Sequence, residues 1–344
     1  MVFKKEKEVY KVSDGKYNFN KQTNKQTAFI LYLRTFSVLS ILLCHLVQAN
    51  PSSYVQMTAQ FFNIGVELFI IISGFCFGLQ GKIDDWKKWY GKRVRRIYIP
   101  YELFLLVLFA LYFITGNKIN IVNWISCVIG IQGATVGVLG ADHTWFITAI
   151  LLCYVITPVL SEISEKLKEQ NIYLAVGAGV IPIMLSFIPA IVFHTIGSKI
   201  CLYVVAFILG KKYREGYRFE KRNFLMYMIL FALALGIRMA GRSLFDGSRI
   251  YECIIVGYTQ CAAAFCIMAI FAVLFYDVGN NKIINRICEN SFEVYLYHYM
   301  FVVGPVSLMH LTGSWLVNSI CVLIVTWGVA VIMRKLAKGL FMGK

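Results

Sequence analysis

The chain has 344 residues, of which 58% are hydrophobic and 15% charged, with a mean hydropathy of +0.66 and a net charge of +16. Soluble domains carry roughly 25% charged residues, so this composition excludes a water-soluble enzyme, and its aromatic content excludes a disordered chain. Long apolar runs between short polar breaks predict an all-α fold, a polytopic integral membrane helical bundle rather than a membrane barrel.

The apolar runs predict about ten transmembrane helices in one domain, which we place at residues 29–334. Residues 1–28 are expected to form a polar, basic tail, and residues 335–344 a shorter basic tail. A further apolar stretch at 119–139 is rich in glycine, and we interpret it as re-entrant or interfacial. The ten predicted helices cover residues 27–48, 59–79, 97–115, 144–160, 172–193, 199–210, 223–240, 251–276, 291–311 and 315–333.

The basic residues gather on alternate sides of these predicted helices. Seven lysines lie in the N-terminal tail, seven basic residues in 81–96 and six in 211–222, whereas the breaks at 49–58, 194–198 and 311–314 contain no Lys or Arg. Cytoplasmic loops of membrane proteins are enriched in Lys and Arg. The pattern therefore predicts that both termini are cytoplasmic, and that the positive charge reflects membrane topology rather than binding to nucleic acid.

Several ionisable side chains fall inside predicted helices, where insertion of a charge costs about 2.5–3.5 kcal/mol, and five of them are the most informative. Arg34 and His45 are eleven residues apart, which places them on one helix face, separated by about 16 Å along the axis. Glu67 lies on the next helix at an intermediate depth, and we expect it to pair with Arg34 or His45. Arg238 and His298 complete the set.

Three arginines, Arg93, Arg95 and Arg96, open the third predicted helix at its basic end. They are either topological anchors or guanidinium groups that bind the phosphates of a cytosolic ligand. No metal site is predicted, because Asp142 and His143 lack a third ligand at a useful spacing, and the ten cysteines are interpreted as small apolar residues.

Five segments in order resemble the membrane-bound acyltransferase-3 family, the integral O-acyltransferases that modify bacterial surface glycans. The resemblance extends from about Phe29 to Ile332. The segments are RTFSVLSILLCH from residue 34, GVELFIIISGF from 65, KRVRRIYIP from 92, HTWFI from 143 and SFEVYLYH from 291.

The resemblance implies a multi-pass protein of the bacterial cytoplasmic membrane that moves an acyl group, commonly acetyl, from cytosolic acyl-CoA to a hydroxyl of a cell-surface or lipid-linked saccharide. The family's Arg-x10-His motif maps onto Arg34 and His45, so His45 is the expected general base. Glu67, at a position where the family usually has Asp, is the expected orienter of the imidazole.

Further roles follow from the same resemblance. Acetyl-CoA is implied as donor substrate rather than as a permanently bound cofactor. Arg34 is assigned to the catalytic residues with His45 and Glu67, and, together with Arg93 and Arg96 of the family's Arg-x-x-Arg motif, it is also expected to bind CoA. The remaining motif residues are assigned to substrate binding, namely Trp145, Ser291, Tyr295 and His298.

A transporter or flippase of a polysaccharide precursor or small metabolite is the alternative function, because intramembrane charges are also typical of transporters. Inverted repeats and paired broken helices would favour it. The sequence shows neither feature clearly.

Overall fold

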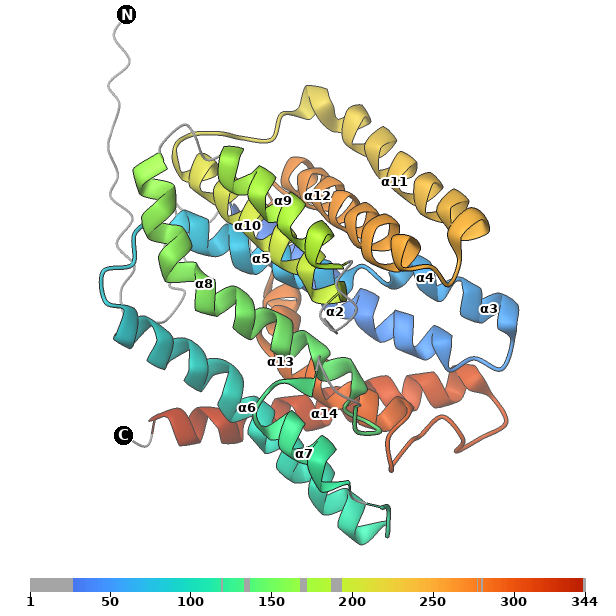
Figure 1. Cartoon of the computed structure of the whole chain (residues 1–344). Coiled ribbons are helices and arrows are strands. Elements are labelled where there is room, and N and C mark those ends of the chain that lie inside the picture. The colour runs from blue at the N-terminus through green and yellow to red at the C-terminus, as the bar shows by residue number, and fades with distance from the viewer. Residues whose placement is uncertain are drawn as a thin grey trace, which may run out of the picture.

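The computed structural model describes residues 27–342 except 119, 133–136, 168–171, 187–193, 277 and 280. The described residues form helices, turns and irregular segments, with no β-strand among them. Residues 1–26, which make up nearly all of the predicted N-terminal tail, lie outside this description. Figure 1 shows α2 (Phe29–Gln48) and α5 (Gly65–Gln80) in the middle of the bundle.

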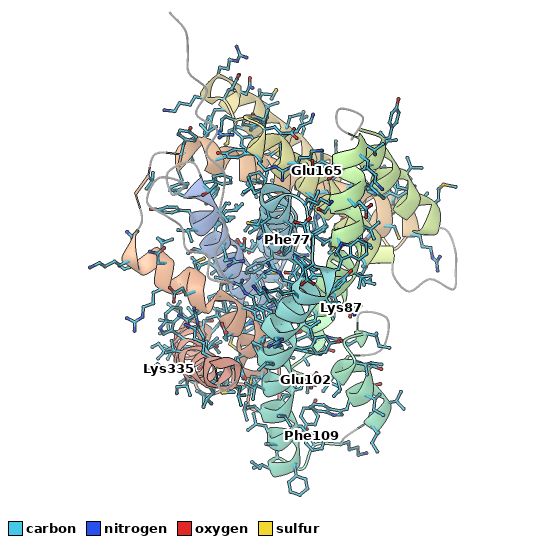
Figure 2. The ribbon with its side chains drawn as sticks, turned by 90° about the vertical axis from the view of Figure 1, so that its left-hand side faces the viewer. Phe77, Lys87, Glu102, Phe109, Glu165 and Lys335 are labelled. Atoms are coloured by element: carbon cyan, nitrogen blue, oxygen red, sulfur yellow. The ribbon has the colours of Figure 1, made fainter. Side chains whose placement is uncertain are left out.

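Two groups of helices flank this centre in Figure 1. One consists of α6 (Trp86–Ile114), α13 (Lys282–Val302) and α14 (Trp315–Met342). The other group contains α9 (Ile172–Ser186), α10 (His194–Arg214), α11 (Phe224–Phe245) and α12 (Gly257–Leu274), while α8 (Trp145–Leu167) runs beside α10. Figure 2 shows α6 along its length, with Lys87 near its start and Phe109 near its end.

Seven helical segments are long and apolar enough to cross a membrane, which confirms a polytopic helical membrane protein. Each of the ten predicted segments also contains helix among the described residues, although residues 187–193 of the segment 172–193 lie outside the description. Helices α9, α10 and α13 are shorter or carry charged residues, so the count of ten stays a prediction. The seven are Phe29–Gln48, Ser53–Gln80, Trp86–Ile114, Asp142–Leu167, Lys221–Phe245, Ile250–Leu274 and Trp315–Leu340.

Several helix boundaries differ from the predictions because charged residues continue the helices beyond their apolar runs. Helix α6 begins at Trp86 rather than near 97, since the side chain of Asp85 accepts a hydrogen bond from Lys88 N and caps the helix. Asn281 caps α13 in the same way, so that helix starts at Lys282 rather than near 291. It ends at Val302, just before Gly304 and Pro305.

Helix α14 continues to Met342, so most of the segment predicted as a C-terminal tail is helical. In the stretch at 119–139, the structure has α7 (Ile121–Val128), an eight-residue helix about 12 Å long. That length is well below the roughly 30 Å hydrocarbon thickness of a bilayer. Helix α7 by itself is therefore too short to cross a membrane.

The second predicted helix is broken. The range 59–79 consists of α4 (Ala59–Phe62) and α5, with Asn63 and Ile64 outside helical conformation between them, and the predicted break at 49–58 contains a further short helix, α3 (Ser53–Met57). The N-terminal part of the helix predicted at 251–276 is a π-helix (Ile250–Val256) that leads into α12. At such interruptions some backbone N–H and C=O groups lack a partner within the helix, so they must form hydrogen bonds with side chains or with other backbone groups.

Helices α5 and α10 pack backbone to backbone. A Cβ atom at Gly74 would lie 2.4 Å from Tyr203 O, and one at Gly210 would lie 2.1 Å from Phe75 O. Because Glu67 pairs with Lys199 and Gly78 meets Phe207, contacts advance in the same direction along both chains. The two helices are therefore parallel, and small residues permit their close approach.

Replacing Gly78 by Ala is expected to destabilise the protein by about 1–3 kcal/mol or more, because the new Cβ would lie 2.0 Å from Phe207 O and force α5 and α10 apart. Gly328 on α14 has no neighbouring atom within 4 Å of its Cβ position, so Gly328→Ala is the matched control. The melting temperatures of the two purified variants and of the unchanged protein, measured in detergent, report the loss of stability. Equal melting temperatures for the two variants would contradict the close packing of α5 against α10.

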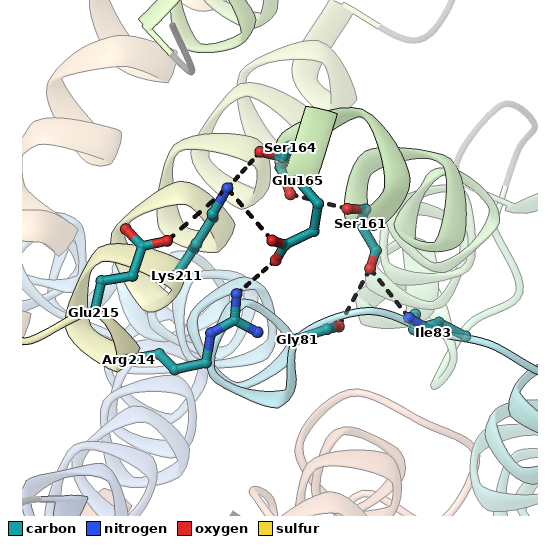
Figure 3. A network of polar contacts seen from close by, with 8 residues as sticks. All are labelled: Gly81, Ile83, Ser161, Ser164, Glu165, Lys211, Arg214 and Glu215. Atoms are coloured by element: carbon teal, nitrogen blue, oxygen red, sulfur yellow. Dashed lines mark hydrogen bonds and ion pairs between the residues drawn. The ribbon is translucent and has the colours of Figure 1, made fainter. Parts of the chain in front are cut away.

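A polar network ties together the ends of α5, α8 and α10 (Figure 3). Arg214 forms an ion pair with Glu165 at 2.5 Å, and the ammonium of Lys211 donates to Ser164 O. Ser161 Oγ donates to Gly81 O, where a φ of +85° favours glycine. Lys211 is 3% exposed, so this residue of the predicted loop 211–222 is in fact a buried part of α10.

Candidate active site

Three histidines from distant parts of the chain meet inside the bundle. His45 comes from α2, His298 from α13, and His143 from a 3-10 turn (Asp142–Thr144) that leads into α8. Nδ1 of His45 lies 2.7 Å from Nε2 of His298, and the two rings are stacked at 5.0 Å between centroids. The ring of His143 is 5.0 Å from that of His298 and 6.4 Å from that of His45.

The main-chain carbonyl of Tyr295 anchors two of these rings. His298 Nδ1 lies 2.6 Å from Tyr295 O, and His143 Nε2 lies 3.0 Å from the same oxygen. In return, Tyr295 OH donates to His143 O at 2.6 Å. Since Tyr295 is 1% exposed and His298 is fully buried, these contacts fix the rings in a water-poor environment.

These contacts determine which nitrogen of each neutral ring carries the proton. A carbonyl oxygen only accepts, so His298 Nδ1 must donate to Tyr295 O, and neutral His298 then has its lone pair on Nε2. His45 Nδ1 faces that lone pair and must donate to it. The proton of neutral His45 is therefore on Nδ1, and its Nε2 retains a lone pair able to accept a proton.

Accessibility distinguishes the three histidines. His298 is fully buried and His143 is 5% exposed, whereas His45 is partly exposed near the end of α2. The ring of Tyr299 lies 4.8 Å from that of His45 and forms part of its surroundings. Of the three rings, His45 is thus the one best placed to meet a substrate.

A second group of polar side chains gathers around Tyr154 of α8. Arg34, Arg93 and Arg96 all interact electrostatically with this tyrosine, although they come from α2 and α6. The guanidinium of Arg93 also stacks over the ring of Phe77 at 4.6 Å. The three arginines assigned from the sequence to one ligand are therefore brought together, and we call them the arginine cluster.

Glu67 has a different partner from the one expected. Its Oε1 accepts a hydrogen bond from Lys199 Nζ at 2.5 Å, and both side chains are almost completely buried. The prediction that Glu67 pairs with Arg34 or His45 is therefore wrong. In the position where Glu67 was expected to orient the imidazole, the structure has His298. Glu67 lies in the first turn of α5, where the helix dipole also favours a carboxylate.

Comparison with protein families decides what kind of protein this is. A family model described as an acyltransferase domain, Acyl_transf_3, matches residues 27–335, a range that contains the histidines and the arginine cluster. The chain belongs to the acyltransferase-3 family. Comparison with curated proteins and with solved structures gives no match.

Two predicted substrate-binding residues of this membrane acyltransferase lie apart from the histidine contacts. Ser291 is 3% exposed, and its hydroxyl donates to Cys288 O within α13 at 2.8 Å. Trp145 begins α8 and packs against the apolar core. Tyr295, by contrast, takes part through its carbonyl and hydroxyl, and His298 through both ring nitrogens.

Sequence reasoning missed two residues of this acyltransferase. The sequence interpretation weighs His143 as a metal ligand beside Asp142 and quotes it in the family segment HTWFI but assigns it no role in the site, although its position directly before the apolar run of α8 is a usable signal. The sequence pattern places Lys199 at the start of an apolar helix, whereas α10 begins at His194 and Lys199 is almost completely buried. Within the described ranges, no group of three or more His, Cys, Asp or Glu residues is arranged to hold a metal ion.

Proposed function

We propose that this membrane acyltransferase transfers an acyl group, most simply acetyl, from cytosolic acyl-CoA to a hydroxyl of a cell-surface or lipid-linked saccharide, with His45 as general base. The observation that carries the proposal is the contact series from Tyr295 O through His298 to His45. It leaves the basic lone pair on Nε2 of the one partly exposed histidine of the three.

The proposed reaction is a direct transfer. His45 Nε2 removes the proton of the acceptor hydroxyl while the oxygen attacks the thioester carbon, since a protonated hydroxyl is a poor nucleophile. The new C–O bond forms, the C–S bond breaks, and the proton passes from His45 to the departing CoA sulfur. His298 is the positioning residue, because its Nε2 accepts the Nδ1 proton of His45 in both the resting and the protonated imidazole.

The arginine cluster supports binding of the donor. Guanidinium groups form bidentate hydrogen bonds with phosphate oxygens, and CoA carries several phosphates. Arg34 and His45 lie on the same continuous helix, about 16 Å apart along its axis. An extended pantetheine arm spans a comparable distance, so phosphates held near Arg34 and Arg93 allow the thioester to reach His45.

The parallel packing of α5 and α10 supports the proposed topology. Two parallel membrane helices require an odd number of crossings between them, and α6, α8 and α9 supply three if α7 does not cross. In this arrangement the protein sits in the bacterial cytoplasmic membrane with both termini in the cytoplasm. The basic starts of α6 and α11 then face the cytosol, in agreement with the positive-inside rule.

The proposed function is tested with membranes that contain the overproduced chain and acetyl-CoA labelled in the acetyl group. Label that appears on a glycan fraction and is released by mild alkali supports O-acetylation. Control membranes lack the chain. Movement of a saccharide across the membrane without a change in its mass would instead support the transporter alternative and contradict the proposal.

His298→Leu is expected to lower kcat by about 10²-fold with little change in KM, because His45 loses the acceptor that fixes its tautomer. His298→Gln places an amide oxygen near the lost Nε2 and is expected to retain most of the activity. Steady-state kinetics and melting temperature are measured for both. If the kcat of each variant follows only its melting temperature, the role of His298 is structural and the positioning proposal fails.

A further inference from the structure

A small pocket lies between α4, α11 and α12, apart from the histidine contacts and the arginine cluster. Most of its wall is apolar, with Phe231, Leu235 and Ile267 among the lining residues. Its polar lining consists of Gln60, Asn63, Arg238, Thr259 and Gln260. One guanidinium, three amides and a hydroxyl therefore border an otherwise apolar cavity, and a few polar groups in an apolar wall are the arrangement by which binding sites orient a ligand.

Arg238 is a cation without a counter-charge. Its Nε is buried and has no hydrogen-bond partner, and no carboxylate of the described residues forms an ion pair with its guanidinium. An arginine inside a membrane helix is costly, and such residues face a cavity or pair with another charge. The free guanidinium therefore indicates a ligand that supplies the missing negative charge.

Neighbouring charges do not satisfy Arg238. Lys199 and Glu67 form an ion pair and neutralise each other. Gln260 connects that pair to the pocket, because its Oε1 accepts a hydrogen bond from Lys199 Nζ at 3.4 Å and its Nε2 donates to Asn63 O. With Arg238 included, the three charges sum to +1. One singly charged anionic group of a ligand would neutralise this net charge.

The pocket is also close to the proposed reaction centre. Helix α4, whose Gln60 lines the pocket, also carries Ala59, which lies in one buried apolar cluster with Cys44, the residue before His45. Helix α11, which carries Arg238, lies at the edge of the bundle in Figure 1, and most of its apolar side chains are exposed. A ligand can therefore place its anionic group at Arg238 and an aliphatic chain along the outer apolar surface of α11.

We propose that this pocket binds the phosphate group of a lipid phosphate, with Arg238 as its charged ligand and the amides of Asn63 and Gln260 beside it. The aliphatic chain lies outside the bundle against α11. If the bound lipid is the carrier of the acceptor saccharide, an assignment that rests on the proposed function, the phosphate positions the sugar near His45.

The binding test uses the purified full chain in dodecyl maltoside and measures thermal stabilisation by decyl phosphate, inorganic phosphate and decanol. Decyl phosphate alone is expected to give a saturable rise in melting temperature. Arg238→Gln is expected to weaken this binding at least about 30-fold, whereas Arg238→Lys, which keeps the charge, is expected to weaken it less. Arg242, exposed on the same helix, provides the control variant Arg242→Gln.

Each outcome decides a part of the proposal. An equal effect of inorganic phosphate would make the pocket a site for free anions, and an equal effect of decanol would make it an apolar groove; either result overturns a lipid phosphate site. Undiminished binding by Arg238→Gln overturns the role of Arg238. His45→Ala should abolish transfer yet still bind decyl phosphate, so loss of the catalytic proposal and loss of this site give different results.

Discussion

Replacing His45 by Ala is expected to lower kcat/KM for acyl transfer by about 10²–10⁴-fold, the contribution typical of a general base. In the proposed reaction the physical reason is that His298 holds the proton of His45 on Nδ1 and leaves the lone pair of Nε2 to act as the base. His45→Gln should have an equally large effect, because an amide fills similar space but does not accept a proton near neutral pH. Transfer from labelled acetyl-CoA is the measurement.

The matched control is His310→Ala, since His310 is exposed and lies outside the helices. Its activity should equal that of the unchanged protein. Melting temperatures of all variants establish that loss of activity is not loss of fold. A His45→Gln protein that folds normally and keeps more than a tenth of the activity would show that another group is the base.

Replacing Lys199 by Met is expected to destabilise the protein by about 3–5 kcal/mol, because it leaves the carboxylate of Glu67 buried without a countercharge. The double change Lys199→Met with Glu67→Leu removes both charges and should recover most of the loss. Breaking a buried ion pair is far more costly than replacing it with apolar side chains of similar volume. The melting temperature of the purified protein in detergent reports the difference.

Lys212→Met serves as the control, because Lys212 is exposed on the same helix and should tolerate the change. The double variant also separates two roles of Glu67. Recovered stability with full transfer activity would mean that the ion pair is structural, whereas recovered stability without activity would assign Glu67 a direct part in the reaction. A Lys199→Met protein as stable as the Lys212→Met protein would contradict the buried pair.

Composition and periodicity were sufficient to predict the fold class, because a bilayer imposes helix on every apolar run long enough to cross it. The long helices from α2 to α12 follow one another along the chain where the apolar runs predict them, and α7 is short, as expected for the glycine-rich stretch at 119–139. Helix ends were less predictable. The polar starts of α6 and α13 depend on the caps Asp85 and Asn281, and hydropathy alone does not register a capping side chain.

The candidate site was predictable where two residues share a helix, and less so where a contact joins distant segments. Arg34 and His45 follow from their spacing on α2. The pairing of Glu67 with Lys199 depends on the glycine contact between α5 and α10, which brings together residues 132 positions apart. The meeting of His143 with His298 likewise depends on how α8 and α13 pack, and a single sequence carries little information on that packing.

The continuity of α2 from Phe29 to Gln48 constrains how two reactants can meet. Arg34 and His45 belong to one uninterrupted helix, so in the proposed reaction no hinge within α2 shortens the distance between the site that would hold the CoA phosphates and the site where the acyl group would react. The donor itself must cover the interval, and a donor whose arm is too short would bind at one end without reacting at the other.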